Sequence, residues 1–192
     1  MGTKTRTLAN NVTSSLGTGS RVLLNTTTVS SDVTAINFDN TLVTSAYSTY
    51  CILIEWIETD ESSGNAGQLK LSTDNGSSFV SQIDQVSTRD RNDDIGSLEG
   101  RKNQSDITIF SGLQISGGSI GGTEIMIYSP EASSRHTMVT IHGANDVHGH
   151  GDNVRMMTGA AQNNQNSAVN YFRITFDNGN ISSAQVKLYG VQ

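Results

Sequence analysis

Apolar and polar residues alternate along much of this chain, and the periodicity of an amphipathic helix is almost absent. Phe172, Ile174 and Phe176, for example, are separated by single polar residues. Side chains of a β-strand point to opposite faces in turn, so this period places one face against a core and the other in water. Four runs show the pattern: residues 69–73, 125–128, 138–141 and 171–176. Their β-branched and aromatic residues are those that strands prefer.

The segment from residue 50 to residue 57 differs because it is apolar on both faces. Ile52, Ile54 and Trp56 share one face, and Cys51, Leu53 and Ile57 share the other. A strand with two apolar faces is typical of a central position, with a layer or a neighbouring subunit against each face. We therefore expect this strand to anchor the core. We also expect Cys51 to be a small buried apolar residue rather than a reactive thiol.

Turn residues separate these runs. Asp74-Asn75-Gly76 and Asp177-Asn178-Gly179-Asn180 contain the Asn and Gly residues that tolerate the positive φ of tight turns. We predict a hairpin at each, joining residues 69–73 to 79–83 and residues 171–176 to 181–189. Short strands without room for crossover helices predict an all-β protein, an antiparallel β-sandwich of jelly-roll-like form.

The length of 192 residues suits a single domain with a proper core. Residues 1–20 are rich in Thr, Ser, Asn and Gly, and we expect them to form an extended N-terminal arm. Residues 21–192 then form one β-sandwich domain. We expect loop insertions near residues 87–106, where charge is densest, and near residues 145–166.

Composition narrows the function classes. Only 34% of residues are hydrophobic and 16% charged, so the core is thin and most of the polarity is neutral. The formal net charge of −6 argues against nucleic acid as a direct partner. No apolar stretch approaches the ~20 residues of a membrane helix, so no membrane partner is expected. With one cysteine there is no intrachain disulfide, and packing or neighbouring subunits must stabilise the fold.

The C-terminal stretch, residues 168–191, resembles the closing hairpin of a β-sandwich module in virion proteins of tailed phages, notably marine and cyanobacterial phages. In that module a strand similar to residues 172–176 leads into a stretch like 178–183 and ends in one like 187–190. The likeness covers roughly residues 30–192. It implies a fold and a setting at the virion surface, as decoration, fibre or tail protein, and it brings no catalytic motif.

One cluster has the residue types of a metal site: His142, Asp146, His148, His150 and Asp152. Imidazole and carboxylate groups bind zinc, iron or nickel, and a His-x-His pair on an extended segment points both rings to one side. Three such pairs around a threefold axis would offer six nitrogens to one iron, an arrangement found in phage spikes and fibres of similar appearance. The neighbouring glycines favour a solvated or interface loop instead. We therefore assign no metal ligand and no cofactor.

Catalytic signatures are weak. Gly117-Gly118-Ser119-Ile120-Gly121 matches the nucleophile-elbow motif, but a strand pattern follows it where the motif requires a helix. Asp93 and Asp94 are adjacent acids in a charged segment, whereas a glycosidase holds two carboxyl groups in a pocket at a fixed separation. We predict a protein that is not an enzyme and has no catalytic residues.

The preferred hypothesis is a bacteriophage virion structural protein that acts by self-assembly and surface contacts, as a capsid decoration (cement) protein or a tail or fibre component. We expect a homotrimer, with other virion proteins such as capsid or tail subunits as further partners. Without disulfides, such a protein suits folding in the host cytoplasm before it is locked into the virion.

The alternative is a receptor-recognition adhesin of the phage particle that binds host glycan. Exposed aromatic rings stack on sugars, and amides hydrogen-bond their hydroxyl groups. The amides would come from residues 162–166, and the rings from Tyr47, Tyr50, Tyr128, Tyr171 and Tyr189. The competing interpretation, which we favour, is that these tyrosines cap sheet edges and interfaces.

Overall fold

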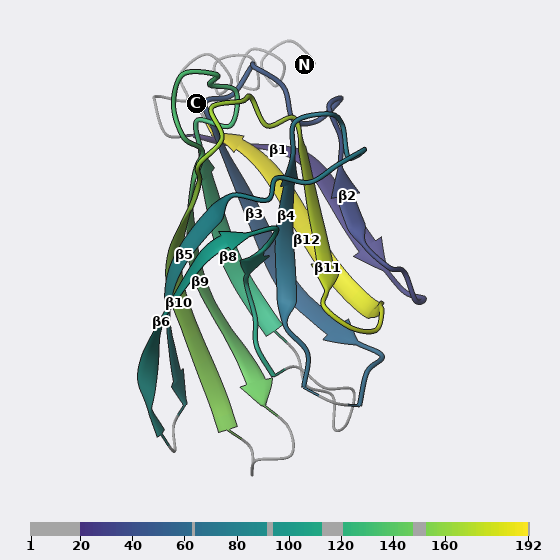
Figure 1. Cartoon of the computed structure of the whole chain (residues 1–192). Helices are drawn as coiled ribbons and strands as arrows, with labels where there is room; N and C mark the ends of the chain where they lie inside the picture. Colours follow the sequence, from purple (N-terminus) through teal and green to yellow (C-terminus); the bar gives the residue numbers. More distant parts are fainter. Residues whose placement is uncertain (1–19, 63, 92–93, 113–120, 148–152, 192) are drawn as a thin grey trace, which may run out of the picture.

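The computed structural model of this chain describes residues 20–62, 64–91, 94–112, 121–147 and 153–191. These residues form two antiparallel sheets packed face to face, so the predicted antiparallel β-sandwich is confirmed (Figure 1). The strands are β1 (Arg21–Val29), β2 (Ile36–Phe38), β3 (Thr49–Thr59), β4 (Gly67–Ser72), β5 (Ile83–Arg91), β6 (Asp94–Gln104), β7 (Ile107–Thr108), β8 (Gly121–Tyr128), β9 (Met138–Val147), β10 (Asn153–Asn163), β11 (Tyr171–Phe176) and β12 (Ile181–Val191). The expected arm, residues 1–20, lies outside the described residues except for Ser20.

The two sheets differ in width. The larger has the strand order β1-β12-β3-β8-β9-β10-β5-β6, and the smaller has the order β2-β11-β4-β7. Three strand pairs are nested along the chain: β3 with β12, β4 with β11, and β5 with β10. This nesting wraps one long antiparallel ribbon across both layers, as in a jelly roll. The β8–β9 pair then widens the larger sheet between β3 and β10.

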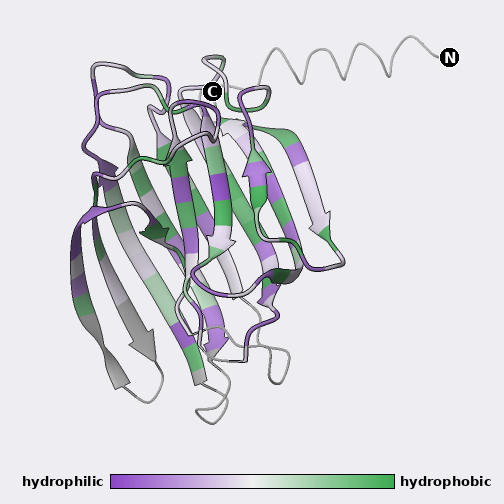
Figure 2. Ribbon diagram, turned by 45° about the vertical axis from the view of Figure 1, so that its right-hand side comes forward, coloured by the Kyte–Doolittle hydropathy of each residue, from purple (hydrophilic) through white to green (hydrophobic). Residues whose placement is uncertain are grey.

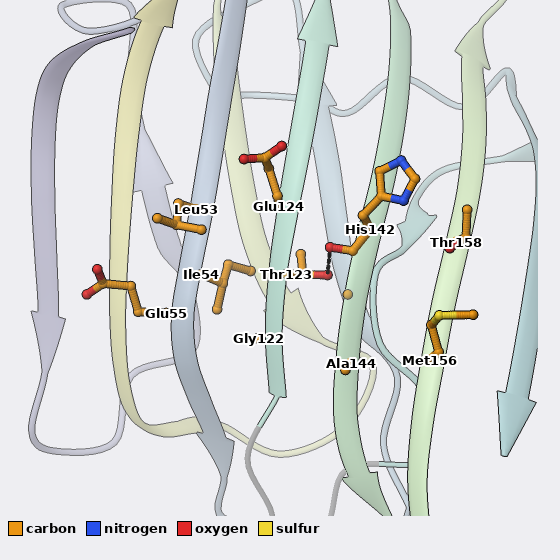
Figure 3. Close-up of a pocket in the computed structure, with 11 residues that line it drawn as sticks. Leu53, Ile54, Glu55, Gly122, Thr123, Glu124, His142, Ala144, Met156 and Thr158 are labelled. Atoms are coloured by element: carbon orange, nitrogen blue, oxygen red, sulfur yellow. Dashed lines mark hydrogen bonds between the residues drawn. The ribbon is translucent and has the colours of Figure 1, made fainter. Parts of the chain in front are cut away.

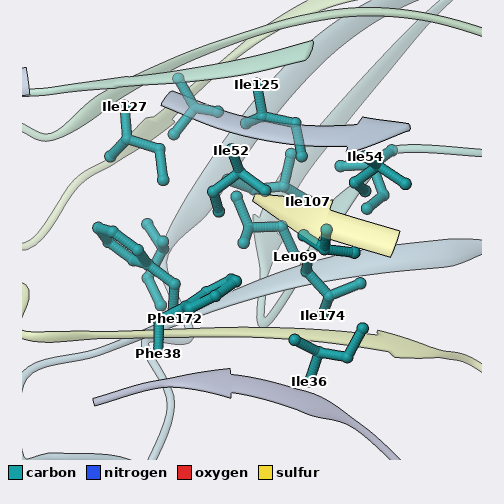
Figure 4. Packing of buried hydrophobic residues seen from close by; sticks show 14 of the residues in the cluster. Ile36, Phe38, Ile52, Ile54, Leu69, Ile107, Ile125, Ile127, Phe172 and Ile174 are labelled. Atoms are coloured by element: carbon teal, nitrogen blue, oxygen red, sulfur yellow. The ribbon is translucent and has the colours of Figure 1, made fainter. Parts of the chain in front are cut away.

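The core fills the space between the two layers (Figure 4). The larger sheet contributes Ile52, Ile54, Ile125 and Ile127, and the smaller contributes Ile36, Phe38, Leu69, Phe172 and Ile174. Tyr50 is fully buried, and its ring lies edge-to-face on Phe172 at 5.6 Å between centroids. Its hydroxyl accepts from the amide of Thr44 at 2.7 Å and donates to the Thr44 carbonyl at 2.6 Å, so the burial leaves no polar atom unsatisfied. Figure 2 shows the alternation of hydrophobic and hydrophilic residues along the strands.

The segment predicted to be central, β3, is an interior strand of the larger sheet. The assignment of side chains to the two faces of this strand is correct only from its start to Ile54. Val186 pairs with Ile54 while Gln185 pairs with Trp56, so Glu55 is an extra residue at a β-bulge. The bulge shifts the alternation by one residue. Ile57 therefore points into the core, and Trp56 lies on the outer side, half-buried, which corrects the predicted positions of both residues.

Both predicted turns exist, but neither forms a hairpin. Asn75 and Gly76 have φ values of 58° and 85°, and Gly179 has 74°, as the turn chemistry requires. However, the first turn leads from β4 in the smaller sheet towards β5 in the larger, and the second leads from β11 to β12, again between sheets. A positive-φ turn fixes the reversal of the chain but not the layer of the next strand. That layer is set by pairing, and β12 pairs with β1 and β3.

The loops expected near residues 87–106 and 145–166 are also corrected, because most of these residues belong to strands. The first region forms the β5–β6 pair and the second lies largely in β9 and β10. Several residues of these strands that point into the protein are polar, so the strands do not show the alternation of apolar and polar residues. Their buried polar groups are satisfied by hydrogen bonds and an ion pair. Gln85 donates to the Thr108 carbonyl at 2.8 Å and accepts from its amide at 3.0 Å. Arg101 forms an ion pair with Asp106 at 3.0 Å.

Candidate interaction surface

Exposed apolar side chains gather on one surface of the sandwich. We call it the outer face: the side of the larger sheet that points away from the smaller sheet. Within the described ranges, the large hydrophobic residues with more than a third of their surface exposed are Leu23, Val86, Leu98, Tyr128, Met138, Val154 and Met156. Because directly paired residues share a face, the strand register places all seven on the outer face.

One cross-strand row of this face carries no charge. It runs across the whole larger sheet as Leu23, Tyr189, Cys51, Met126, Thr140, Ala160, Val86 and Gly100. Each residue is paired with the next across a strand boundary, and none carries a charge. A solvent-facing row normally includes charged side chains, because these residue types are mostly exposed. The missing charges indicate a row suited to contact, while the next row of the same face holds Lys187, Glu124 and His142.

The half of the outer face over β1, β12 and β3 is partly covered by its own side chains, although Leu23 on the edge strand β1 remains 53% exposed. Arg21 reaches from β1 to β8, where its guanidinium donates to Glu124 at 2.6 Å and lies 3.9 Å from the sulfur of Met126. The hydrogen bond from Arg21 lowers the pKa of the Glu124 carboxyl. Lys187 on β12 forms an ion pair with Glu55 on β3. These long side chains cover the apolar residues beneath them.

Cys51 lies in the covered half. Its side chain belongs to the outer face, yet it is fully buried, which confirms the prediction of a buried cysteine. Burial raises the pKa of the thiol to about 11, because the thiolate would lose its hydration. The thiol is therefore in its neutral form near pH 7, and a nucleophilic role has no support.

Arg21 reaches only as far as Met126, and beyond it no described side chain forms such a cover over the other half of the outer face, on β8, β9, β10, β5 and β6. We call its apolar residues the methionine patch: Met126, Tyr128, Met138, Ala144, Val154, Met156, Ala160, Val86 and Leu98. Leu98 is the most exposed of the large hydrophobic residues, at 72%. Methionine and aromatic residues are enriched and charges depleted in the cores of protein interfaces. Flexible thioether side chains also adapt to irregular partner surfaces.

A shallow hollow of about 670 Å³ adjoins the methionine patch (Figure 3). Gly122 on β8 and Ala144 on β9 are paired and form its floor, because neither has a long side chain. Leu53, Glu124, His142 and Met156 stand around it. Beneath the floor the strands approach closely: a Cβ on Gly143 would lie 1.7 Å from the Thr123 hydroxyl oxygen. That hydroxyl instead donates to the His142 carbonyl at 3.2 Å.

The predicted metal cluster is only partly described. His142 and Asp146 both lie on the outer face of β9, separated by Ala144, and His142 is exposed. The other three candidates, His148, His150 and Asp152, lie outside the described residues. No group of three His, Cys, Asp or Glu side chains that could hold a metal ion occurs within the parts of the chain that the structure describes.

The weak catalytic motifs also fall mostly outside the described part. Of the Gly-x-Ser-x-Gly match only Gly121 is described, and it begins strand β8 as the sequence pattern predicts. Asp93 is likewise outside, while Asp94 begins β6. In the same described ranges, no helix is long and apolar enough to cross a membrane.

The residues proposed for glycan stacking are dispersed. Tyr50 and Tyr171 are buried, Tyr47 packs edge-to-face on Tyr50 at 5.9 Å, and only Tyr128 of the five is exposed. The amides of residues 162–166 bond within their own segment. The Gln162 amide nitrogen donates to the Asn164 side chain at 2.8 Å, and the Gln165 backbone donates to Asn163 at 2.9 Å. The predicted set therefore does not form one sugar platform.

Fold and surface together define a class: an all-β sandwich with one bare apolar sheet face. No family model matches the chain, and no curated protein matches it. Among solved structures, a chain of the T=1 particles derived from infectious bursal virus was found at 12% identity, with a TM-score of 0.14. The match covers 91% of this chain and 41% of that chain. A likeness this low carries no argument about fold or function.

Proposed function

We propose that this chain is a structural protein of a bacteriophage particle that acts by self-assembly and surface contacts, as a capsid decoration protein or a tail or fibre component. The observation that carries the mode of action is the methionine patch, an apolar surface that no layer of the described residues covers. The phage setting rests on the resemblance of residues 168–191 to the virion module. The proposal gives no residue a catalytic, cofactor or metal-binding role.

The physical mechanism is burial of apolar area between subunits. Burial contributes about 25 cal/mol per Å² removed from water, offset by the loss of rotational freedom and by side-chain ordering. A patch on paired strands has a backbone that is already ordered, so the entropic cost of binding is smaller than for a loop. In a particle, many copies of one weak contact add up through multivalency.

The proposed partners are copies of this chain, in a homotrimer, and other virion proteins such as capsid or tail subunits. The adhesin alternative receives little support, because Tyr50 and Tyr171 are buried and the Gln162 amide, although on the same face as Tyr128, binds Asn164. The two functions predict different defects. Particles that lack a decoration protein should adsorb normally but break under heat or osmotic shock, whereas particles that lack an adhesin should be sturdy but fail to attach.

The direct test is the mass of the purified chain in solution. Size-exclusion chromatography with light scattering should give an oligomer, with a trimer as the expected state, that dissociates on dilution. A strict monomer at all accessible concentrations would contradict self-assembly. The measurement needs no ligand and no assumption about the location in the particle.

A further inference from the structure

We propose that the methionine patch is the docking surface for a second copy of this chain. This inference rests on the proposed function and deepens it, because it assigns self-assembly to five strands of one sheet face. It also names the contact: Leu98 of one copy in the hollow over Gly122 and Ala144 of another.

The area of the patch fits a subunit interface. The patch lies on the outer face of five strands of 8–11 residues spaced ~4.8 Å apart, and this whole face, polar positions included, measures about 25 by 30 Å, or roughly 750 Å². A standard stable interface buries about 800 Å² on each partner. The face that carries the patch is therefore large enough for a whole subunit and larger than a short peptide would need.

The distribution of charge favours a copy of the same chain over an oppositely charged partner. The chain has a formal net charge of −6, so two copies repel each other over most of their surface. The patch residues themselves carry no charge, and of the carboxylates on the outer face of the same strands, Glu124 is paired with Arg21 while Asp84 and Asp146 lie near the ends of β5 and β9. Copies approach there with the least repulsion. A strongly basic partner would find no carboxylate among the patch residues.

The shape of the surface is self-complementary. Leu98 on β6 projects as the most exposed large apolar side chain, and the hollow over Gly122 and Ala144 lies on β8 and β9 of the same face. Each copy therefore presents both a projection and a hollow. Such a pair is satisfied by a two-fold contact or by a ring in which each projection enters the next copy, and the expected trimer is a ring.

The first experiment introduces charge into the patch. Val86→Glu with Leu98→Glu places two carboxylates at positions that are 54% and 72% exposed, so folding should be retained. The matched control is Thr26→Glu, an exposed position on the outer face of β1 beyond the patch. Sedimentation velocity of wild type and both variants, with circular dichroism to verify folding, gives the readout.

The expected result is an oligomeric wild type, an oligomeric Thr26→Glu control and a monomeric double variant. An oligomeric wild type with an equally oligomeric double variant would overturn this inference and leave the proposed function intact. Dissociation of both variants would also overturn it, because the contact would not be confined to the patch. A monomeric wild type would overturn the inference and the proposed function together.

A second experiment traps the contact. The residue pair Leu98→Cys and Ala144→Cys lies on β6 and β9, three strand spacings apart, or about 14 Å. A disulfide needs Cα atoms within about 7 Å, so this pair cannot close within one chain. Cys51 is buried and does not compete. Mild oxidation should yield covalently linked chains, while Thr26→Cys with Ala144→Cys should stay mostly unlinked. Equal yields from both pairs would reject the contact.

Discussion

Both sheets alternate inward and outward residues, but the outward residues are polar on the smaller sheet and largely uncharged or apolar on part of the larger sheet. On the smaller sheet, the cross-strand row Lys70, Arg173 and Asn37 faces solvent with polar groups that bind one another. Arg173 donates to Asn37 at 2.8 Å, and its guanidinium carbon lies 4.6 Å from the ring centroid of Phe79. On the larger sheet, the comparable positions hold Met126, Thr140 and Ala160.

This difference teaches that alternation identifies strands but not their environment. Both sheets bury one face against the same core, so the inner positions look alike in the sequence. Only the outward residues distinguish the two surfaces. Those of the smaller sheet are polar and contact adjacent side chains, whereas those of the methionine patch are apolar and exposed. On the larger sheet itself the boundary lies at Arg21, whose side chain covers the row as far as Met126.

The largest expected effect is a difference in the free energy of unfolding between two variants in the same cross-strand row, one at the buried Cys51 and one at the exposed Ala160. Cys51→Lys puts an ammonium group into a fully buried position beside Arg21, and we expect a loss of about 3 kcal/mol in the free energy of unfolding. Ala160→Lys changes an exposed position of the same row and should cost less than about 0.5 kcal/mol. Urea denaturation at low protein concentration, where assembly contributes least, measures both. Equal losses would show that Arg21 does not divide the face.

A smaller loss in the free energy of unfolding is expected for a variant on the outer surface of the smaller sheet. Arg173→Ala removes the hydrogen bond to Asn37 and the cation–π contacts with Phe79 and Tyr171, which should lower the free energy of unfolding by about 1–2 kcal/mol. Lys70→Ala is the control, because its ammonium lies 6.0 Å from the Phe79 ring and should contribute less. Thermal melting compares the two. A larger loss for Lys70→Ala would contradict the proposed role of Arg173.

Arg21→Ala should leave stability nearly unchanged and alter reactivity instead. The ion pair with Glu124 is more than a third exposed, so its loss should cost less than about 1 kcal/mol. Removal of the long side chain uncovers Cys51, so labelling by a thiol reagent at pH 8 should become faster than in the wild type. Lys187→Ala, which breaks the pair with Glu55, is the comparison variant. Unchanged labelling in Arg21→Ala would show that other residues cover the thiol.

The smallest effect concerns the turn that leaves the smaller sheet. Hydrogen bonds from Ser78 and Ser72 lower the pKa of Asp74 from 3.8 to about 2. The ionised form therefore stabilises the fold fully above pH 4, and this contribution is lost as the pH falls through 2. Asp74→Asn should melt below the wild type at pH 7, and the difference should narrow between pH 4 and pH 2. A difference independent of pH would contradict the role of the charge.

Much of the fold could be predicted from the pattern of residues. Alternation around Ile125, Ile127, Phe172 and Ile174 identified strands whose inner residues are buried. The layer of each strand could not be predicted, because turn residues fix a reversal and not a pairing partner. Nor could the bulge at Glu55, since it depends on the register with β12. The strands β5 and β6 were missed because Gln85 and Ser87, which are buried, are polar.

The candidate surface was not predicted, although a signal for it existed. The outward positions of β8 and β9 include Met126, Tyr128 and Met138, residue types unusual for a strand face in water. That the three lie side by side follows only from the register between the two strands. Val86, Leu98 and Met156 join them through β10 and β5, which lack clear alternation. The metal cluster, in contrast, was prominent in sequence, yet only His142 and Asp146 of it lie in the described part.

The central claim is that copies of this chain bury the methionine patch, and methionine oxidation tests it most directly. Met138 and Met156 are 39% and 51% exposed, whereas Met157, adjacent in the chain, is 1% exposed and serves as an internal reference. Peroxide oxidation followed by mass spectrometry should show Met138 and Met156 reacting fast in dilute protein and slowly in concentrated protein, with Met157 slow in both. Equal rates for Met138 and Met156 at all concentrations would contradict the account.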